Sequence, residues 1–176
     1  MILSDGIITL RGIEKEDAEI LLELINSADV EDSVLGWSFP VTKHQQLQWI
    51  EALKNENNVR YSVVVGNKAI GMASLTNIDW KNRVANLNIK LHIKFRGQGF
   101  GKRVIAMLKE YAFSELNIHC LTAGILEDNV ASIQIFEKNG FELEGRLRHR
   151  IYKRGSYKNV LIFSCLKSED NERNWK

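Results

Sequence analysis

The sequence is poor in the residues that mark several classes of protein. Its 176 residues include one proline and only two cysteines, Cys120 and Cys165, which do not form a Cys-x-x-Cys pair. A disulfide-stapled secreted fold and a cysteine zinc site are therefore not predicted. Both cysteines lie in apolar stretches, where we expect them to behave as buried small hydrophobic residues. No metal is expected.

Long apolar runs are missing as well. No stretch approaches the ~20 consecutive apolar residues that a membrane-spanning helix needs. The first ten residues, MILSDGIITL, carry no basic segment that would begin a signal peptide. We therefore expect a cytoplasmic protein with no membrane partner.

Excess charge of either sign is small. The chain has 24 Lys and Arg residues against 22 Asp and Glu residues, a formal net charge of +2. This balance does not favour a nucleic-acid partner. The length suits one domain that buries roughly 70% of its unfolded surface. We assign residues 1–167 to this domain and residues 168–176 to a charged C-terminal tail.

Hydrophobic periodicity predicts an α+β domain with a mixed, mostly antiparallel sheet. The segment 28–41, which holds the only proline, is expected to be a loop. Its aromatic residues, Trp37 and Phe39, form either a lid on the core or a wall of a substrate pocket. Strands are predicted over residues 7–11, 60–65, 69–76, 86–93, 119–126, 141–152 and 157–166, and helices over residues 14–27, 42–53, 102–112 and 128–139.

A glycine-rich turn, Arg96-Gly97-Gln98-Gly99-Phe100-Gly101, separates the fourth predicted strand from the third predicted helix. The free N–H groups at a helix N-terminus carry partial positive charge and bind phosphate. Glycines lack Cβ atoms, so a pyrophosphate can approach the main chain closely. Arg96 and Lys102 add full charges on either side. The turn is typical of a phosphate-binding loop.

Two familiar nucleotide-binding motifs do not fit this turn. A dinucleotide-binding Gly-x-Gly-x-x-Gly pattern fails because Arg103 and Val104 follow Gly101. A P-loop fails because Lys102 is not followed by serine or threonine, the hydroxyl residue that holds magnesium. A flexible strand-to-helix turn that binds nothing stays the alternative.

Two motifs resemble the GNAT superfamily of N-acetyltransferases. Arg96-x-x-Gly99-x-Gly101 resembles its Arg/Gln-x-x-Gly-x-Gly/Ala signature, and residues 128–145, DNVASIQIFEKNGFELEG, resemble its "DN..A...Y.K.GF..EG" stretch. The motifs stand in the right order and at the right spacing. The chain looks most like the branch that contains RimJ/RimL-type ribosomal-protein acetyltransferases, spermidine acetyltransferases and enzymes acting on nucleotide-linked amino sugars.

The resemblance implies a GNAT fold and acetyl-CoA as co-substrate. The expected fold has about seven strands, splayed at the central strand and flanked by about four helices, and the protein is expected to form a homodimer. By the resemblance, the main chain of the central strand binds pantetheine, the glycine loop binds pyrophosphate, and two residues of the second motif border the pantetheine arm and the thiol. These cofactor-binding residues are Ile89, Lys90, Leu91, Arg96, Gly97, Gln98, Gly99, Phe100, Gly101, Lys102, Asn129 and Phe136.

The catalytic groups depart from the family pattern. Many relatives have a proton-donating tyrosine at the position of Phe136, which cannot donate, and a glutamate at the position of Asn86. Ser132 lies one helical turn before Phe136 and is predicted to replace the tyrosine. A serine satisfied by the backbone is the alternative. Glu144 is predicted as the base, with His92 or a water chain as alternatives.

The resemblance implies direct attack of a primary amine on acetyl-CoA in a ternary complex. The acceptor is expected to be a protein or peptide N-terminus, a nucleotide-linked amino sugar or a polyamine, bound in part by Trp37 and Phe39. Two other functions stay open. The chain could be a catalytically weak CoA-binding module, because Phe136 and Asn86 lack the usual groups, or a nucleotide-binding fold of another class.

Overall fold

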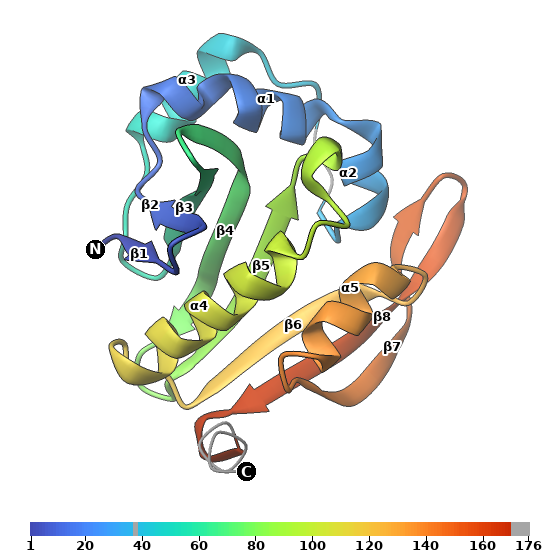
Figure 1. Cartoon of the computed structure of the whole chain (residues 1–176). Helices are drawn as coiled ribbons and strands as arrows, with labels where there is room; N and C mark the ends of the chain where they lie inside the picture. Colours follow the sequence, from blue (N-terminus) through green and yellow to red (C-terminus); the bar gives the residue numbers. More distant parts are fainter. Residues whose placement is uncertain (37–38, 170–176) are drawn as a thin grey trace.

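A computed structural model of the chain describes residues 1–36 and 39–169 (Figure 1). One sheet contains the strands β1 (Leu3–Ser4), β2 (Ile8–Arg11), β3 (Val59–Val65), β4 (Lys68–Asp79), β5 (Val84–Leu91), β6 (Cys120–Leu126), β7 (Glu142–Lys153) and β8 (Ser156–Leu166). The helices are α1 (Ala18–Asn26), α2 (Ala28–Ser33), α3 (Lys43–Glu51), α4 (Phe100–Ser114) and α5 (Val130–Glu137), with short 3₁₀ helices η1 (Lys15–Asp17) and η2 (Ile93–Phe95).

The strand order is β1-β2-β3-β4-β5-β6-β8-β7, and every neighbouring pair is antiparallel except β5 and β6. The predicted mixed, mostly antiparallel sheet is therefore confirmed. The strand that the sequence pattern did not reveal is β1. Its two residues are too few to produce a period-2 alternation of polar and apolar side chains.

One face of the sheet carries the main core. Helices α4 and α5 lie on this face, α4 over β5 and α5 over β6 and β8 (Figure 1). Helix α4 packs one stripe of apolar side chains, including Val104, Ile105 and Leu108, against alternate residues of the strands. Strand residues in this core include Leu75, Leu87, Leu121 and Phe163.

A smaller core lies between α1, α2 and α3. Leu21 and Leu24 of α1, Val30 of α2 and Ile50 of α3 are buried together, and Met72 of β4 packs against them. Met72 precedes the main-core residue Ala73, and successive strand residues point to opposite faces. The N-terminal helices therefore cover the other face of the sheet.

The predicted loop over residues 28–41 is wrong for its first part, which forms α2. This helix has six residues and buries only Val30, so it offers no apolar stripe for a pattern search to detect. Asp29 and Glu31 in its first turn complement the positive end of the helix. No helix in the described ranges is long and apolar enough to cross a bilayer.

Candidate active site

The sheet opens between its only parallel pair of strands. β5 and β6 are paired only from Val84 to Asn86 and from Cys120 to Thr122, although β5 continues to Leu91 and β6 to Leu126. The edges of the two strands that face each other beyond this short ladder are therefore not joined by strand pairing. The predicted splay at the central strand is this opening.

The glycine loop lies at the end of β5, where η2 leads into α4. Gly97 and Gly99 have φ of 74° and 82°, a left-handed conformation that glycine adopts without a Cβ penalty. Arg96 donates through Nε to the carbonyl oxygen of Leu91 at 3.0 Å, which fixes the loop to the strand. Gly99 is the N-cap of α4, so the N–H groups of the first helical turn have no partner inside the helix.

The loop residues fit a diphosphate. A Cβ added at Gly101 would lie 3.3 Å from Cδ1 of Ile135 in α5, so a larger residue here would require the Ile135 side chain to shift by a few tenths of an ångström. Cβ atoms added at Gly97 or Gly99 would meet no atom within 4 Å, and their side of the loop is therefore open. Unpaired amides and the positive helix end supply the charge complement for phosphate oxygens.

A cleft of about 320 Å³ passes through the splay. On the α5 side it is bordered by Asn129, Ser132 and Phe136. The rest of its wall comes from β5, β6, the β3–β4 hairpin and the segment after α2, with the residues Ser33, Val34, Leu35, Gly36, Arg60, Met72, Ser74, Thr76, Leu87, Asn88, Ile89, Lys90, Ala123, Gly124 and Ile125.

Asn129 joins two walls of the cleft. Its Oδ1 accepts from the backbone N–H of Ser132 at 3.1 Å and so caps α5, while its Nδ2 donates to the carbonyl oxygen of Ser33 at 3.0 Å. The Ser132 hydroxyl itself makes no hydrogen bond to any residue that the structure describes. Phe136 is buried and packs edge-on against Phe141, with ring centroids 5.0 Å apart.

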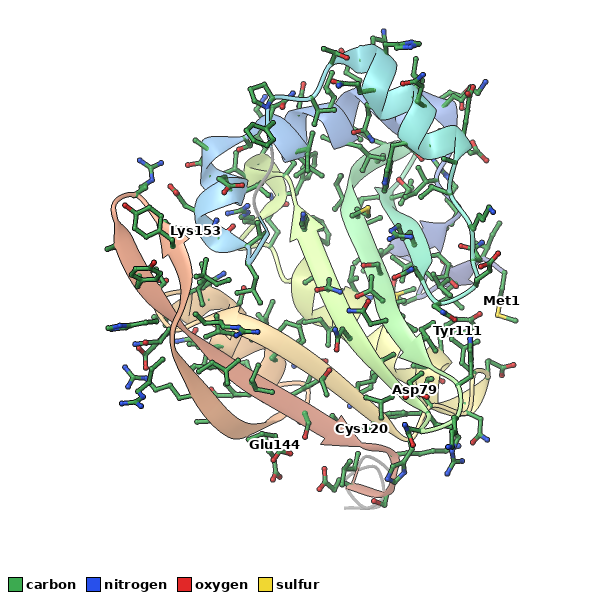
Figure 2. All side chains as sticks on the ribbon, turned by 180° about the vertical axis from the view of Figure 1, so that it is seen from behind. Met1, Asp79, Tyr111, Cys120, Glu144 and Lys153 are labelled. Atoms are coloured by element: carbon green, nitrogen blue, oxygen red, sulfur yellow. The ribbon has the colours of Figure 1, made fainter. Side chains whose placement is uncertain are left out.

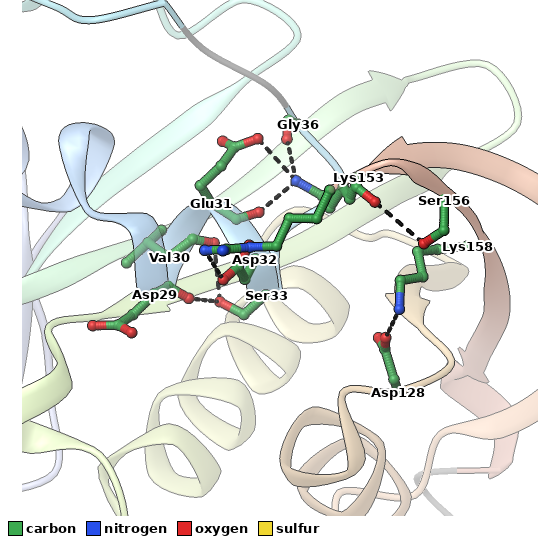
Figure 3. Close-up of polar contacts among 11 residues, drawn as sticks. Asp29, Val30, Glu31, Asp32, Ser33, Gly36, Asp128, Lys153, Ser156 and Lys158 are labelled. Carbon is green, nitrogen blue, oxygen red and sulfur yellow. Dashed lines mark hydrogen bonds and ion pairs between the residues drawn. The ribbon is translucent and has the colours of Figure 1, made fainter.

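The segment Ser33–Gly36 is held from the opposite side by the β7–β8 hairpin (Figure 3). The buried ammonium of Lys153 donates to the carbonyl oxygen of Glu31, to Oε1 of Glu31 at 3.0 Å and to the carbonyl oxygen of Gly36 at 3.1 Å. Next to it, Arg154 forms a two-bonded ion pair with Asp32, at 2.6 and 2.7 Å. We call the three Lys153 bonds the Lys153 clamp.

Two cationic side chains reach the cleft from the face opposite α4 and α5. Lys90 of β5 and Arg60 of β3 line it, and neither has a hydrogen bond or ion pair to a described residue. Burial lowers the pKa of the Lys90 ammonium from its ordinary value, because the charged form loses water. The negative charge of Glu31 opposes this decrease, and the positive charge of Lys153 adds to it.

A second cavity of about 350 Å³ adjoins the cleft, and Met72 and Lys90 line both. Its other walls come from α1, the segment before α3, and α3 itself. They are mostly apolar, with the residues Leu21, Leu24, Ile25, Val41, Gln45, Gln46 and Trp49.

The structure brings most of the predicted site residues together. Ile89, Lys90, Asn129, Ser132 and Phe136 line one cleft, and the end of β5 carries the loop 96–101 next to it. Phe39 is 70% exposed and is not among the lining residues, and Trp37 lies outside the described residues.

The two candidate bases do not line the cleft. Glu144 lies in a bulge of the edge strand β7, where its Oε1 accepts a hydrogen bond from the Ser164 hydroxyl. Figure 2 shows it far along the hairpin from Lys153. The bulge explains the misplacement, because it shifts the register of side chains that a simple alternation would assign. His92 caps η2 and lies 3.3 Å from Glu23.

Sequence reasoning missed three features of the site. The Lys90 side chain could have been found, because Asn86, Asn88 and Lys90 alternate with apolar residues and so share the face of β5 opposite the main core. Arg60 carries the same signal on β3. No sequence signal indicates the Lys153 clamp, because Lys153 and Glu31 are 122 residues apart.

Comparisons with known proteins agree with this geometry. A family model described as an acetyltransferase (GNAT) domain matches residues 8–142. Spermidine N(1)-acetyltransferase of Escherichia coli K12 is 27% identical over 158 residues, which cover 88% of this chain and 83% of the relative. The crystal structure of spermidine N-acetyltransferase from Vibrio cholerae in complex with CoA and spermine has a TM-score of 0.88 at 22% identity, covering 95% and 99% of the chains.

A ribosomal-protein acetyltransferase is similar in fold as well. RimL, a ribosomal L7/L12 alpha-N-protein acetyltransferase solved in complex with coenzyme A, has a TM-score of 0.84 at 20% identity, covering 94% of this chain and 98% of that one. At these identities the structural likeness shows the fold and leaves the acceptor open.

Proposed function

The chain belongs to the GNAT family of acetyltransferases and is an N-acetyltransferase, and from this premise we propose that it moves acetyl from acetyl-CoA to a primary amine by direct attack in the cleft between β5 and β6. The observation that carries the proposal is the placement of the glycine loop. It lies at the end of β5, at the head of the splay through which the cleft passes.

In this proposal the chain holds the donor mainly with its backbone. The amides of residues 97–102 bind the diphosphate, supported by the charge of Lys102. The edge of β5 at Ile89–Leu91 has no strand partner toward β6, so its N–H and C=O groups can pair with the pantetheine amides as an added strand would. Acetyl-CoA supplies the activated acyl group, and its thioester then lies within the splay.

The residues of α5 complete the donor side. Ser132 is proposed to donate a proton to the departing thiolate, because it lines the cleft and its hydroxyl has no competing partner among the described residues. Asn129 holds the Ser132 backbone and the Ser33 carbonyl at the same time. Phe136 has no proton to donate, and we assign it only to the wall of the site.

The acceptor amine must lose a proton before it can attack. No carboxylate or histidine lines the cleft within the described residues, so we propose that water removes this proton or that the amine enters neutral. Glu144 is not needed for this step. The activity against a given amine then rises with pH until that amine is itself deprotonated.

The experiment that tests the proposal measures thiol release from acetyl-CoA with spermidine, an N-terminal peptide, a UDP-4-amino sugar and an aminoglycoside. Turnover of any amine is expected, and Ser132→Ala is expected to lower kcat about 100-fold. Ser114→Ala, the same change on the exposed end of α4, is the control and should leave kcat unchanged.

The specific alternative is a CoA-binding module with little catalytic power, which the loss of a hydroxyl at Phe136 favours. Calorimetric binding of CoA without thiol release from any amine of the panel would support that alternative and reject the transferase proposal. Equal kcat for Ser132→Ala and wild type, with active enzyme, would reject only the role of Ser132.

We also propose a homodimer. The edge strand β7 exposes the apolar side chains of Leu143 and Leu147, and an unpaired strand edge favours association. Sedimentation that shows only monomer at micromolar concentration would contradict this.

A further inference from the structure

The charges that line the cleft are all of one sign. Lys90 and Arg60 are its only charged lining residues among those the structure describes. Arg60 lies beside the ring of Trp49, with its guanidinium carbon 6.0 Å from the ring centroid, and Lys90 lies where the cleft meets the second cavity. Neither cation forms an ion pair with a carboxylate of the described residues.

The nearest acidic side chains are already paired. Glu31 accepts from Lys153 within the Lys153 clamp, and Asp32 holds Arg154 in a two-bonded ion pair. The charge of Glu31 also reaches Lys90 and partly opposes the effect of burial on its pKa, but Glu31 forms its hydrogen bond and ion pair with Lys153 and not with Lys90. The cleft therefore opposes a polycation such as spermidine, which would bring several positive charges next to Lys90.

The burial of Lys90 has a cost that an anion would remove. Lys90 is half-buried, and an ammonium that loses part of its water without an ion-pair partner is destabilised, which is the cause of its lowered pKa. A carboxylate or phosphate placed against Lys90 would form a charge-assisted hydrogen bond in half-buried surroundings, where such bonds are stronger than at the fully exposed surface.

The second cavity indicates the chemical character of the rest of the acceptor. Leu21, Leu24 and Trp49 line it, and it meets the cleft at Met72 and Lys90. A molecule whose amine lies in the cleft and whose anionic group contacts Lys90 can extend an apolar part between α1 and α3.

We infer that the acceptor is a primary amine that also carries a carboxylate or phosphate, with Lys90 as the residue that selects for the anionic group. This inference rests on the proposed function, because it concerns the acceptor side of the same cleft. It separates the chain from relatives whose names state that they act on spermidine.

The first experiment measures binding of amines to the complex with CoA, in which no acetyl group is available for transfer. Phenylalanine and phenylethylamine form a matched pair that differs by the carboxylate, and both carry an apolar ring for the second cavity. Phosphoethanolamine and ethanolamine form the matched pair for phosphate. Spermidine is the polycation. Calorimetry gives Kd for each.

Wild type is expected to bind one member that carries the anionic group about 10- to 100-fold more tightly than its counterpart without that group, the range of a charge-assisted hydrogen bond. The pair that shows the preference identifies carboxylate or phosphate as the source. Tighter binding of spermidine than of every anionic amine, equal binding within both pairs, or no measurable binding of any anionic amine would overturn the inference.

Three variants test whether Lys90 is the cause. Lys90→Met should abolish the preference for the anionic member, and Lys90→Arg should keep it because arginine stays charged. Lys68→Met is the matched control, since Lys68 is exposed on β4 and lines neither cavity. A preference that survives Lys90→Met would overturn the role of Lys90.

Kinetics separate anion recognition from proton transfer. If Lys90 acted as a base in its neutral form, Lys90→Met and Lys90→Arg would both lower kcat with amines that carry an anionic group and with amines that lack one, and that result would overturn the inference. Thiol release with any amine tests the proposed transferase function independently. An active enzyme that prefers polyamines leaves the proposed function intact and rejects only the anionic acceptor.

Discussion

The Lys153 clamp makes a prediction that connects stability with substrate use. Lys153→Met removes the ammonium and keeps most of the side-chain volume. Three hydrogen bonds disappear, and they are the bonds that tie the turn of the β7–β8 hairpin to Glu31 and Gly36. The segment Ser33–Gly36, which forms one wall of the cleft, then loses its attachment on the hairpin side.

The expected loss of stability follows from the groups left behind. The Glu31 carboxylate is 30% exposed and can return to water, so its share is small. The carbonyl oxygens of Glu31 and Gly36 lose a charged donor. Loss of a partner costs about 1–3 kcal/mol for a fully buried group, and Gly36 is exposed enough to be hydrated. We therefore expect the free energy of unfolding to fall by about 1–3 kcal/mol in total.

Lys153→Met should change kcat/KM for the acceptor more than it changes the Kd for acetyl-CoA. A displaced cleft wall should lower kcat/KM for the acceptor about 10- to 100-fold, because small misplacements of a reacting group reduce rates strongly. The glycine loop shares no contact with the clamp, so the Kd for acetyl-CoA should change by no more than about twofold.

Urea denaturation, steady-state kinetics and calorimetry measure these three quantities. Lys158→Met is the matched control, because Lys158 lies on the same hairpin and forms an exposed ion pair with Asp128 at 2.8 Å (Figure 3). Its loss should cost about 0–1 kcal/mol. Unchanged stability in Lys153→Met would refute the clamp, and lowered stability with unchanged kcat/KM would refute its control of the cleft wall.

Three further substitutions or conditions test other parts of the structure. Gly99→Ala forces a Cβ into φ 82° and should cost about 1–2 kcal/mol of stability and weaken calorimetric CoA binding, whereas Gly12→Ala, which meets no atom within 4 Å, should do neither. Gly124→Val places a Cβ 2.8 Å from Cδ1 of Leu35, so it should lower stability by about 1–3 kcal/mol and reduce kcat/KM, while Gly145→Ala, where the added Cβ is free, should preserve kcat/KM. Burial would raise the pKa of Asp17, but hydrogen bonds from Arg11 and from the N–H of Glu14 outweigh it and hold that pKa below the ordinary 3.8. The contribution of the Asp17 carboxylate to folding stability should therefore be present at neutral pH and decline as pH falls below 3.8. Urea curves of Asp17→Asn should lack this part of the acid loss.

The elements with long periodic patterns could be predicted from the sequence. The helix predicted over residues 42–53 begins with Thr42-x-x-Gln45, a capping-box sequence, and the Gln45 N–H donates to the Thr42 hydroxyl at 3.3 Å. The helix predicted over residues 128–139 is followed by Gly140, whose φ of 83° is typical of a glycine that ends a helix. Such signals act over a few residues, and local sequence is enough to reveal them.

The parts that could not be predicted depend on distant contacts. The partners of Lys153 and Asn129 come from the segment after α1, and nothing near either residue in the chain indicates them. The sequence predicts Glu144 as the base, but Glu144 does not line the cleft. The bulge between Leu143 and Gly145 carries its side chain to Ser164 instead. A bulge changes the direction of side chains without changing the periodicity on either side.

The short ladder between β5 and β6 leaves the sheet incomplete. Beyond Asn86 and Thr122 the two strands have no partner across the splay, and backbone polar groups away from water need one. A donor bound along β5, as proposed above, would then act as a missing piece of the folded state. Acetyl-CoA at 100 times its Kd would add ~2.7 kcal/mol to the stability, against ~5–15 kcal/mol for a typical domain. The lifetime of this enzyme in a cell would therefore follow the supply of its own substrate, and starvation for acetyl-CoA would leave a chain that unfolds more readily and is degraded sooner.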